Sequence, residues 1–136
     1  MNAPEALTRL FAEAFPQAMG VGFVVESVDD DASVVIRLDT GREHLRPGDV
    51  VSGPTVMTLA DTAMYASLIA RLGTAAIPSV TSSVEVHFLA KIRQGPVRAR
   101  CRLLKVGRRL AVGTVTFWAD DPAAVLAHAT LTYAMP

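Results

Sequence analysis

One carboxylate lies in the middle of an apolar segment that is typical of a buried helix, and it is the residue best suited to acid–base chemistry. The segment covers residues 52–73 (SGPTVMTLADTAMYASLIARLG), and Asp61 is its single acid. An ionised carboxylate in apolar surroundings is costly unless it is paired or hydrogen-bonded. Two interpretations stay open: a structural aspartate satisfied by a backbone N–H, Thr58 or Thr62, or a general base or nucleophile that faces a cleft.

The start of the same segment offers a place for a developing negative charge. Proline is favoured at the first helical position, so Gly53-Pro54 indicates that a helix begins here. Gly53 has no side chain, so another group can come close to its backbone. The free N–H groups and the dipole of such an end attract negative charge and can hold the oxyanion of an acyl-transfer intermediate. The alternative is that Gly53-Pro54 only forms the tight turn into the helix and binds no ligand.

The spacing of these two residues has a geometric consequence. Gly53 and Asp61 are eight residues apart, which corresponds to about 12 Å along a helix. One acyl carbonyl needs both groups within about 3 Å of its reacting atoms. A single helix cannot supply both groups, whereas two antiparallel copies can. If the site is catalytic, we therefore expect it to be shared across a symmetric dimer.

These residues need a fold that surrounds the long helix. Apolar residues recur at helical spacing in residues 4–15, with a break near residues 16–20, and an irregular segment, residues 40–53, precedes the long helix. Strand patterns are expected at 21–28, 32–39, 79–90, 97–106, 109–119 and 124–134. Strands and helices do not alternate along this chain, as they would in a parallel α/β fold. We therefore expect one α+β domain, residues 1–136, in which an antiparallel sheet of consecutive hairpins curls round the helix.

Composition excludes several other classes of protein. The chain has 136 residues with 13 basic and 13 acidic side chains, a balance that disfavours a nucleic-acid-binding protein. Cys101 is the single cysteine, and no spacing of His, Cys, Asp and Glu is typical of a metal site. The N-terminus lacks a signal-peptide pattern, and no apolar run reaches the roughly 18 residues that span a bilayer. We expect a soluble, cytoplasmic protein without a metal or cofactor of its own.

Several motifs together resemble the hotdog-fold acyl-CoA thioesterases of the PaaI-like group, which is named for phenylacetic acid degradation. Gly53, followed by Asp61 within LADTAMYA, resembles the central helix of that family. VEVHFLAKIRQGP looks like its next strand, and residues 106–136 (VGRRLAVGTVTFWADDPAAVLAHATLTYAMP) look like its C-terminal hairpin. The similarity covers most of the chain from about Val21 onward. It implies the hotdog fold, a long helix wrapped by a curved antiparallel sheet, in chains that form dimers and often tetramers.

The resemblance also implies a reaction, the hydrolysis of an acyl-CoA thioester to a carboxylate and free coenzyme A. By position, Asp61 matches the family's acidic base or nucleophile, and Gly53 matches its oxyanion-binding N–H. The family's polar residue upstream of this glycine falls near His44 or Arg46, so His44 joins the catalytic candidates and Arg46 the substrate-binding ones. The family's helper hydroxyl after the helix falls near Thr81, Ser82 or Ser83.

The sequence departs from the family at the start of the helix. The family commonly has His-Gly-Gly there, and this chain has Ser52-Gly53-Pro54. The histidine is missing, and Pro54 has no N–H, so a second backbone donor is lost too. Oxyanion stabilisation then rests on Gly53 alone or on Gly53 with help from Ser52.

Other side chains are candidates for holding the rest of the substrate. Guanidinium groups suit the phosphates of coenzyme A because they offer planar, paired donors. Arg93, Arg108 and Arg109 are therefore candidates, with solvated surface arginines as the alternative. Met64 and Tyr65 follow Asp61 at helical spacing and are candidates for lining an acyl pocket.

Residue alternation separates a polar face from a core face in the strand at residues 97–106. The side chains of Arg98, Arg100 and Arg102 fall on one face, which we interpret as solvated, and Cys101 falls on the core face. Met57 also lies at helical spacing from Asp61, so it is a candidate for the acyl pocket too, but packing in the core is the interpretation that we favour for it.

Two other functions remain open. One is a hotdog hydratase or dehydratase acting on acyl thioesters, which is disfavoured because such chemistry usually needs an Asp-His or Glu-His pair near the helix. The only histidine close in sequence is His44. The other is a non-catalytic protein that binds acyl-CoA, which the missing helix-start histidine makes conceivable.

Overall fold

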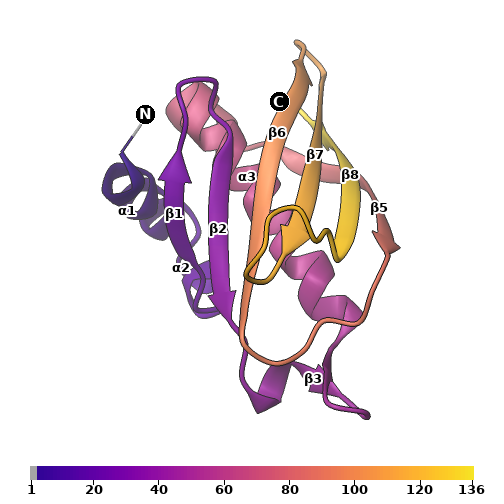
Figure 1. The fold of residues 1–136 in the computed structure, drawn as a ribbon. Helices are drawn as coiled ribbons and strands as arrows, with labels where there is room; N and C mark the ends of the chain where they lie inside the picture. The colour runs from indigo at the N-terminus through magenta and orange to yellow at the C-terminus, as the bar shows by residue number, and fades with distance from the viewer. Residues whose placement is uncertain (1–2) are drawn as a thin grey trace.

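A long helix packed against a curved antiparallel sheet makes up most of the molecule (Figure 1). The computed structural model describes residues 3–136. Its α-helices are α1 (Pro4–Ala14), α2 (Pro16–Met19) and α3 (Gly53–Leu72). The main sheet contains β1 (Val24–Val28), β2 (Val34–Asp39), β5 (Val80–Phe88), β6 (Pro96–Val106), β7 (Leu110–Trp118) and β8 (Ala127–Ala134). The short elements are η1 (Arg42–His44), β3 (Leu45–Arg46), β4 (Val50–Val51) and η2 (Gly73–Ala76). The α+β architecture expected from the sequence is confirmed.

Local sequence explains where α3 begins and ends. Ser52 is its N-cap, and the Ser52 Oγ accepts a hydrogen bond from the Thr55 N–H at 3.3 Å. Pro54 follows in the first turn, where its missing N–H costs nothing. At the other end, Gly73 has a φ of 64°, a left-handed conformation that glycine adopts without strain and that stops the helix. No helix in residues 3–136 is long and apolar enough to cross a membrane.

Small residues bring the sheet and α3 into close contact. Four alanines along α3 are buried: Ala60, Ala63, Ala66 and Ala70. On β7, a Cβ atom at Gly113 would lie 2.6 Å from the Met64 Sδ, so this position has room only for glycine unless Met64 moves. Cys101 also lies in this layer with no exposed surface, which confirms that it belongs to the core. Close packing of complementary surfaces therefore contributes to the contact between α3 and the sheet, in addition to hydrophobic burial.

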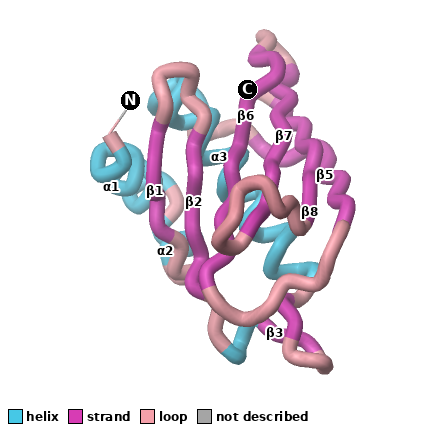
Figure 2. The backbone as a smooth tube through the Cα atoms, viewed as in Figure 1, coloured by secondary structure: helices cyan, strands magenta, loops and turns pink. Residues whose placement is uncertain are grey.

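The strand order differs from a simple series of hairpins. The sheet has the order β1-β2-β6-β7-β8-β5, so β5 lies beside β8 at the far edge, and the chain then crosses to β6 (Figure 2). The expectation that β5 and β6 form a hairpin is therefore wrong. The break expected near residues 16–20 is the short helix α2, and the irregular segment at 40–53 contains the two-stranded β3–β4 sheet.

Strand β5 forms an open edge of the sheet. Most of its residues are exposed, and only Val84 and Val86 are half-buried. Phe88, at its end, has 53% of its surface exposed. Met57 of α3 has 46% exposed, so the expectation that it packs in the core is wrong. An unpaired strand edge with exposed apolar side chains nearby is typical of a surface that another chain covers.

Candidate active site

Asp61 lies on the side of α3 that the sheet leaves partly open, and two hydroxyl groups hold it. The Thr81 Oγ1 donates a hydrogen bond to Asp61 Oδ1 at 2.7 Å, and the Tyr133 Oη donates to the same oxygen at 2.7 Å. Among the described residues, Asp61 Oδ2 accepts no hydrogen bond. The carboxylate is thus fixed through one oxygen, and the other keeps its lone pairs for a substrate or a water molecule.

The structure also selects among the three hydroxyl candidates that follow the helix. A β-bulge between Thr81 and Ser83 interrupts the pairing of β5 with β8, and Thr81 lies opposite Tyr133. The bulge directs the Thr81 hydroxyl at the acid, as bulges near functional sites often redirect side chains. Ser82 and Ser83 are exposed and make no hydrogen bond to Asp61.

Tyr133 is a candidate site residue that the sequence analysis did not identify. It is 3% exposed, and its ring stacks on that of Tyr65 with centroids 6.2 Å apart. Burial raises the pKa of Tyr133 well above its usual range, and the nearby Asp61 carboxylate adds to this effect. The phenol therefore keeps its proton and acts as a hydrogen-bond donor to Asp61. Strand alternation places Tyr133 on the core face of β8, but only the register between β5 and β8 reveals its partner.

Asp61 opens into a cavity with apolar and aromatic walls. The cavity has a volume of about 410 Å³ and is lined by Phe15, Asp61, Tyr65, Ile77, Ser79, Val80, Thr81 and Tyr133. The expectation for Tyr65 fits this geometry, since its ring forms one wall while its hydroxyl donates to the Ile77 carbonyl at 2.8 Å. The structure does not bring Met64 to the cavity, because this side chain is fully buried between α3 and the sheet.

Gly53 lies in a different hollow on the same chain. That hollow has a volume of about 450 Å³, and none of its residues lines the Asp61 cavity: Arg46, Val50, Val51, Gly53, Val56, Phe88, Leu89, Ala90, Lys91 and Ile92. The Phe88 ring comes within 3.5 Å of where a Cβ of Gly53 would lie. Arg46 and Gly53 are thus brought together, while Gly53 and Asp61 are kept apart within one chain, as the eight-residue spacing predicts.

His44 and Ser52 support the beginning of α3. The backbone carbonyl of His44 accepts a hydrogen bond from the Ser52 N–H at 2.9 Å, and its Nδ1 accepts one from the Gly41 N–H at 2.9 Å. The Ser52 hydroxyl lies 2.8 Å from that of Thr55 in the helix cap. Neither side chain lines the Asp61 cavity or the Gly53 hollow, although Ser52 directly precedes Gly53.

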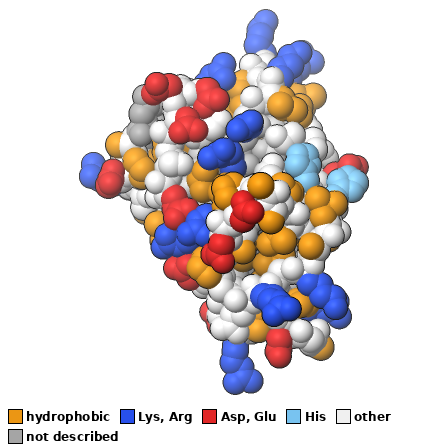
Figure 3. Space-filling view, viewed as in Figure 1, with side chains coloured by type: hydrophobic (Ala, Val, Ile, Leu, Met, Phe, Trp, Pro, Cys, Tyr) orange, Lys and Arg blue, Asp and Glu red, His pale blue; other side chains and the backbone are white. Residues whose placement is uncertain are grey.

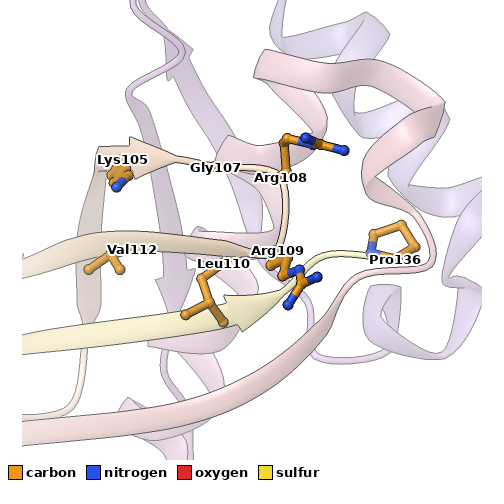
Figure 4. A pocket seen from close by; sticks show the side chains of 7 residues that line it. All are labelled: Lys105, Gly107, Arg108, Arg109, Leu110, Val112 and Pro136. Carbon is orange, nitrogen blue, oxygen red and sulfur yellow. The ribbon is translucent and has the colours of Figure 1, made fainter.

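The arginines considered for phosphate binding are divided between two hollows. Arg93 lies with Lys91 in a hollow of about 620 Å³ that Gly48 and Asp49, in the turn between β3 and β4, also line. Arg108 and Arg109 lie in the β6–β7 turn, in a hollow of about 910 Å³ that Pro136 also lines; Figure 4 shows their side chains flanking the end of the chain.

The hollow at Arg108 and Arg109 lies at the same end of the sheet as the mouth of the Asp61 cavity. Leu110, the residue after this turn, pairs with Ala134 of β8, and Ala134 pairs with Val80, which lines the Asp61 cavity. Within residues 3–136, no group of three or more His, Cys, Asp or Glu side chains is arranged to hold a metal ion.

Comparisons with known proteins found a matching family model and similar solved structures. The family model described as the thioesterase superfamily matches residues 48–126. A candidate thioesterase from Silicibacter sp. is 34% identical, with a TM-score of 0.84 over 98% of this chain and 91% of that one. A phenylacetic acid degradation-related candidate thioesterase from Ralstonia eutropha is 25% identical, with a TM-score of 0.82 over 95% and 98% of the two chains.

The fold extends to more distant relatives. The PaaI protein from the phenylacetic acid degradation operon of E. coli shares the fold at 16% identity, with a TM-score of 0.81 over 98% of this chain and 93% of that chain. The comparison with curated protein sequences found no match.

Proposed function

Because this chain belongs to the thioesterase superfamily, we propose that it hydrolyses acyl-coenzyme A thioesters at a site that two subunits share. The observation that carries the proposal is the state of Asp61, which is fixed through Oδ1 and free at Oδ2 beside a cavity of about 410 Å³. A structural aspartate satisfied by its own helix would not need donors from two other elements. A held carboxylate facing a cavity is what a general base or a nucleophile requires.

In the proposed reaction, Asp61 Oδ2 takes a proton from water as the water oxygen bonds to the thioester carbon. The carbonyl oxygen then carries the negative charge, which the N–H of Gly53 of the partner subunit stabilises. The C–S bond breaks next, and the thiolate of coenzyme A takes up the proton. In the other route that the residues allow, Oδ2 itself bonds to the thioester carbon, and the C–S bond breaks to release coenzyme A as its thiolate. Water then hydrolyses the resulting anhydride, which yields the acid product and regenerates the Asp61 carboxylate.

Strand β5 supports a geometry in which two chains complete each other. Within one chain, Thr81 near the start of β5 lies beside Asp61, and Phe88 at its end lies beside Gly53. If two β5 edges pair antiparallel about a two-fold axis, the beginning of one strand meets the end of the other. This arrangement brings Asp61 of one subunit toward Gly53 of the partner subunit, and it also covers the open edge and the exposed Met57.

The rest of the substrate fits the surroundings of this cavity. The acyl group occupies the space between Phe15, Tyr65 and Ile77, which offers apolar contact. The phosphates of coenzyme A lie toward Arg108 and Arg109, since their hollow is at the same end of the sheet. A hydratase is disfavoured, because no histidine is among the residues that line either the Asp61 cavity or the Gly53 hollow.

The direct test is the release of free thiol from a panel of aryl, short-chain and long-chain acyl-CoAs. We expect the parent protein to turn over at least one of them, and Asp61→Asn to lower kcat roughly 100- to 10,000-fold. Asp61→Asn keeps the size of the side chain and its ability to accept hydrogen bonds, so its melting temperature and acyl-CoA binding should stay close to those of the parent. Parent-like turnover by Asp61→Asn would show that the catalytic assignment is wrong.

A further inference from the structure

A second cluster of positive charge lies on the face of the sheet that points away from α3. The strand registers place Arg100 of β6 opposite Thr116 of β7, and Thr116 opposite His128 of β8. One step along the sheet, Arg102 lies opposite Thr114. Directly opposite side chains on one face have Cβ atoms roughly 5 Å apart, so these cationic groups and hydroxyls form one continuous patch.

The arginines of β6 differ in whether the fold provides a carboxylate for them. Arg98 donates to Glu26 Oε1 at 2.9 Å and to the Ala119 carbonyl at 2.6 Å. Neither Arg100 nor Arg102 makes an ion pair with any acid of residues 3–136. The hydrogen bonds from Ser33 are the main cause of the lowered pKa of Asp31, and the charge of Arg102 adds a smaller effect. The expectation that all three arginines form one solvated face is therefore too simple.

Arg100 is the most unusual of the three. Its guanidinium lies over the ring of Trp118, 5.7 Å from the centroid. Its Nε is buried and has no hydrogen-bond partner, and it is the only buried side-chain nitrogen or oxygen in the described part of the chain in that state. Buried donors are nearly always satisfied, so an unpartnered one calls for a missing ligand or a function. The indole stabilises the positive charge but cannot accept the hydrogen of Nε as an oxygen would.

These residues surround a hollow with cationic and hydroxyl walls. It has a volume of about 370 Å³ and is lined by Arg100, Arg102, Thr114, Thr116, Trp118, Pro122 and His128, with no carboxylate among them. Residues 119–126, the connection between β7 and β8, cross this face of the sheet and provide Pro122 as one wall (Figure 2). Figure 3 views the same face, where blue cationic, pale-blue histidine and red acidic side chains lie among uncharged ones. None of the residues of the Asp61 cavity contributes to this hollow.

We propose that this hollow, which we call the outer-face site, binds a phosphoryl group. Two guanidinium groups provide paired N–H donors for a phosphate dianion, and the hydroxyls of Thr114 and Thr116 provide two more donors. A ligand that carries a carboxylate would have too few acceptor oxygens for the N–H and O–H donors of these four side chains. The volume exceeds what one phosphate fills, so the ligand is either inorganic phosphate with water or a small phosphate monoester. The site is separate from the proposed hydrolytic site and does not depend on it.

The chain contains a built-in reporter for this proposal, since Trp118 is its single tryptophan. We would titrate the intact protein at constant ionic strength with inorganic phosphate, and separately with adenosine monophosphate, following tryptophan fluorescence and the heat of binding. The expected result is a saturable change in both signals for at least one of the two probes. Tighter binding of the nucleotide than of phosphate identifies a monoester ligand, and equal binding identifies the free anion.

Matched variants make the result specific. Arg100→Met keeps an apolar stem against Trp118 and removes the charge, and it should weaken binding at least about tenfold. Arg71→Met makes the same chemical change at an exposed position at the end of α3 and should bind like the parent. The proposal is overturned if neither probe gives saturable heat, or if Arg100→Met binds as tightly as the parent. It is also overturned if phosphate fails to bind while Arg100→Met changes the sedimentation coefficient, because this face is then a contact between subunits.

Discussion

At the residue scale, the chemistry depends on how Asp61 is held. Thr81 and Tyr133 come from neighbouring strands and donate to one oxygen of the carboxylate, so its orientation is set by the sheet and not by α3 alone. Hydrogen bonds to a charged group are worth more than neutral ones, about 1.5–3 kcal/mol each. The pair therefore holds the carboxylate in one orientation, as the proposed role of a general base or nucleophile requires.

Replacing Tyr133 by Phe tests this role. The variant keeps the ring that stacks on Tyr65 and removes only the hydroxyl. We expect kcat to fall about tenfold, because the carboxylate loses one of the two donors that orient it. Thr81→Val should produce a similar change from the other strand. A lower melting temperature with unchanged kcat would mean that Tyr133 only supports the fold.

Sequence reasoning reached part of this site, and the reason for its limit is physical. Asp61 stands out because charge is rare in an apolar helix, and the Thr81 region follows the helix directly. Tyr133 lies 72 residues from Asp61, and nothing local to it indicates that neighbour. Its role depends on a long-range strand register, which neither alternation nor composition determines.

At the scale of elements, α3 was predictable, and so was a strand at the position of β5, but the place of β5 in the sheet was not. The apolar run, Ser52 at the N-cap and Gly73 at the end specify α3 locally. The place of β5 beside β8 depends on contacts between distant parts of the chain, so the hairpin expected between β5 and β6 was wrong. The expectation that Met57 packs in the core failed for a similar reason, because the pattern of one helix does not show which of its sides the sheet covers.

The edge that β5 forms gives a prediction about assembly. Phe88→Lys places a charge where the account puts the subunit contact, while Phe88 is already half exposed in one chain, so the isolated fold should tolerate it. We expect the variant to dissociate at micromolar concentration in sedimentation experiments and to lose thiol release together with the dimer. Leu104→Lys, at a residue 64% exposed on β6, is the matched control and should leave both unchanged. A fully active Phe88→Lys monomer would refute the shared site.

At the scale of the whole molecule, three buried groups make the fold sensitive to alkaline pH. Burial raises the pKa of Cys101 to about 12 and raises the pKa values of Tyr133 and Tyr65 above their usual range. The folded state thus holds these protons more tightly than the unfolded chain does. Their contribution to stability is complete below the unfolded pKa values and is lost as pH rises through the folded ones.

Urea unfolding at several pH values measures this effect. The free energy of unfolding should decrease steadily from about pH 8 to about pH 11. Cys101→Ala removes one of the three groups. Its free energy of unfolding should be lower at pH 8, because a core side chain is shortened, and it should decrease less steeply as the pH rises. A free energy of unfolding that does not change over this range would contradict the burial of these groups.

The central claim is that neither subunit is competent alone, and mixing two inactive variants tests it most directly. Asp61→Asn removes the acid, and Gly53→Val places a branched side chain against Phe88, over the N–H that the oxyanion needs. Each variant alone should be inactive. After joint refolding in equal amounts, half of the dimers are hybrids in which Asp61 of one subunit meets Gly53 of the other, so the mixture should recover roughly a quarter of the parent activity. A mixture as inactive as its two components, with hybrid dimers shown to be present, would contradict the account.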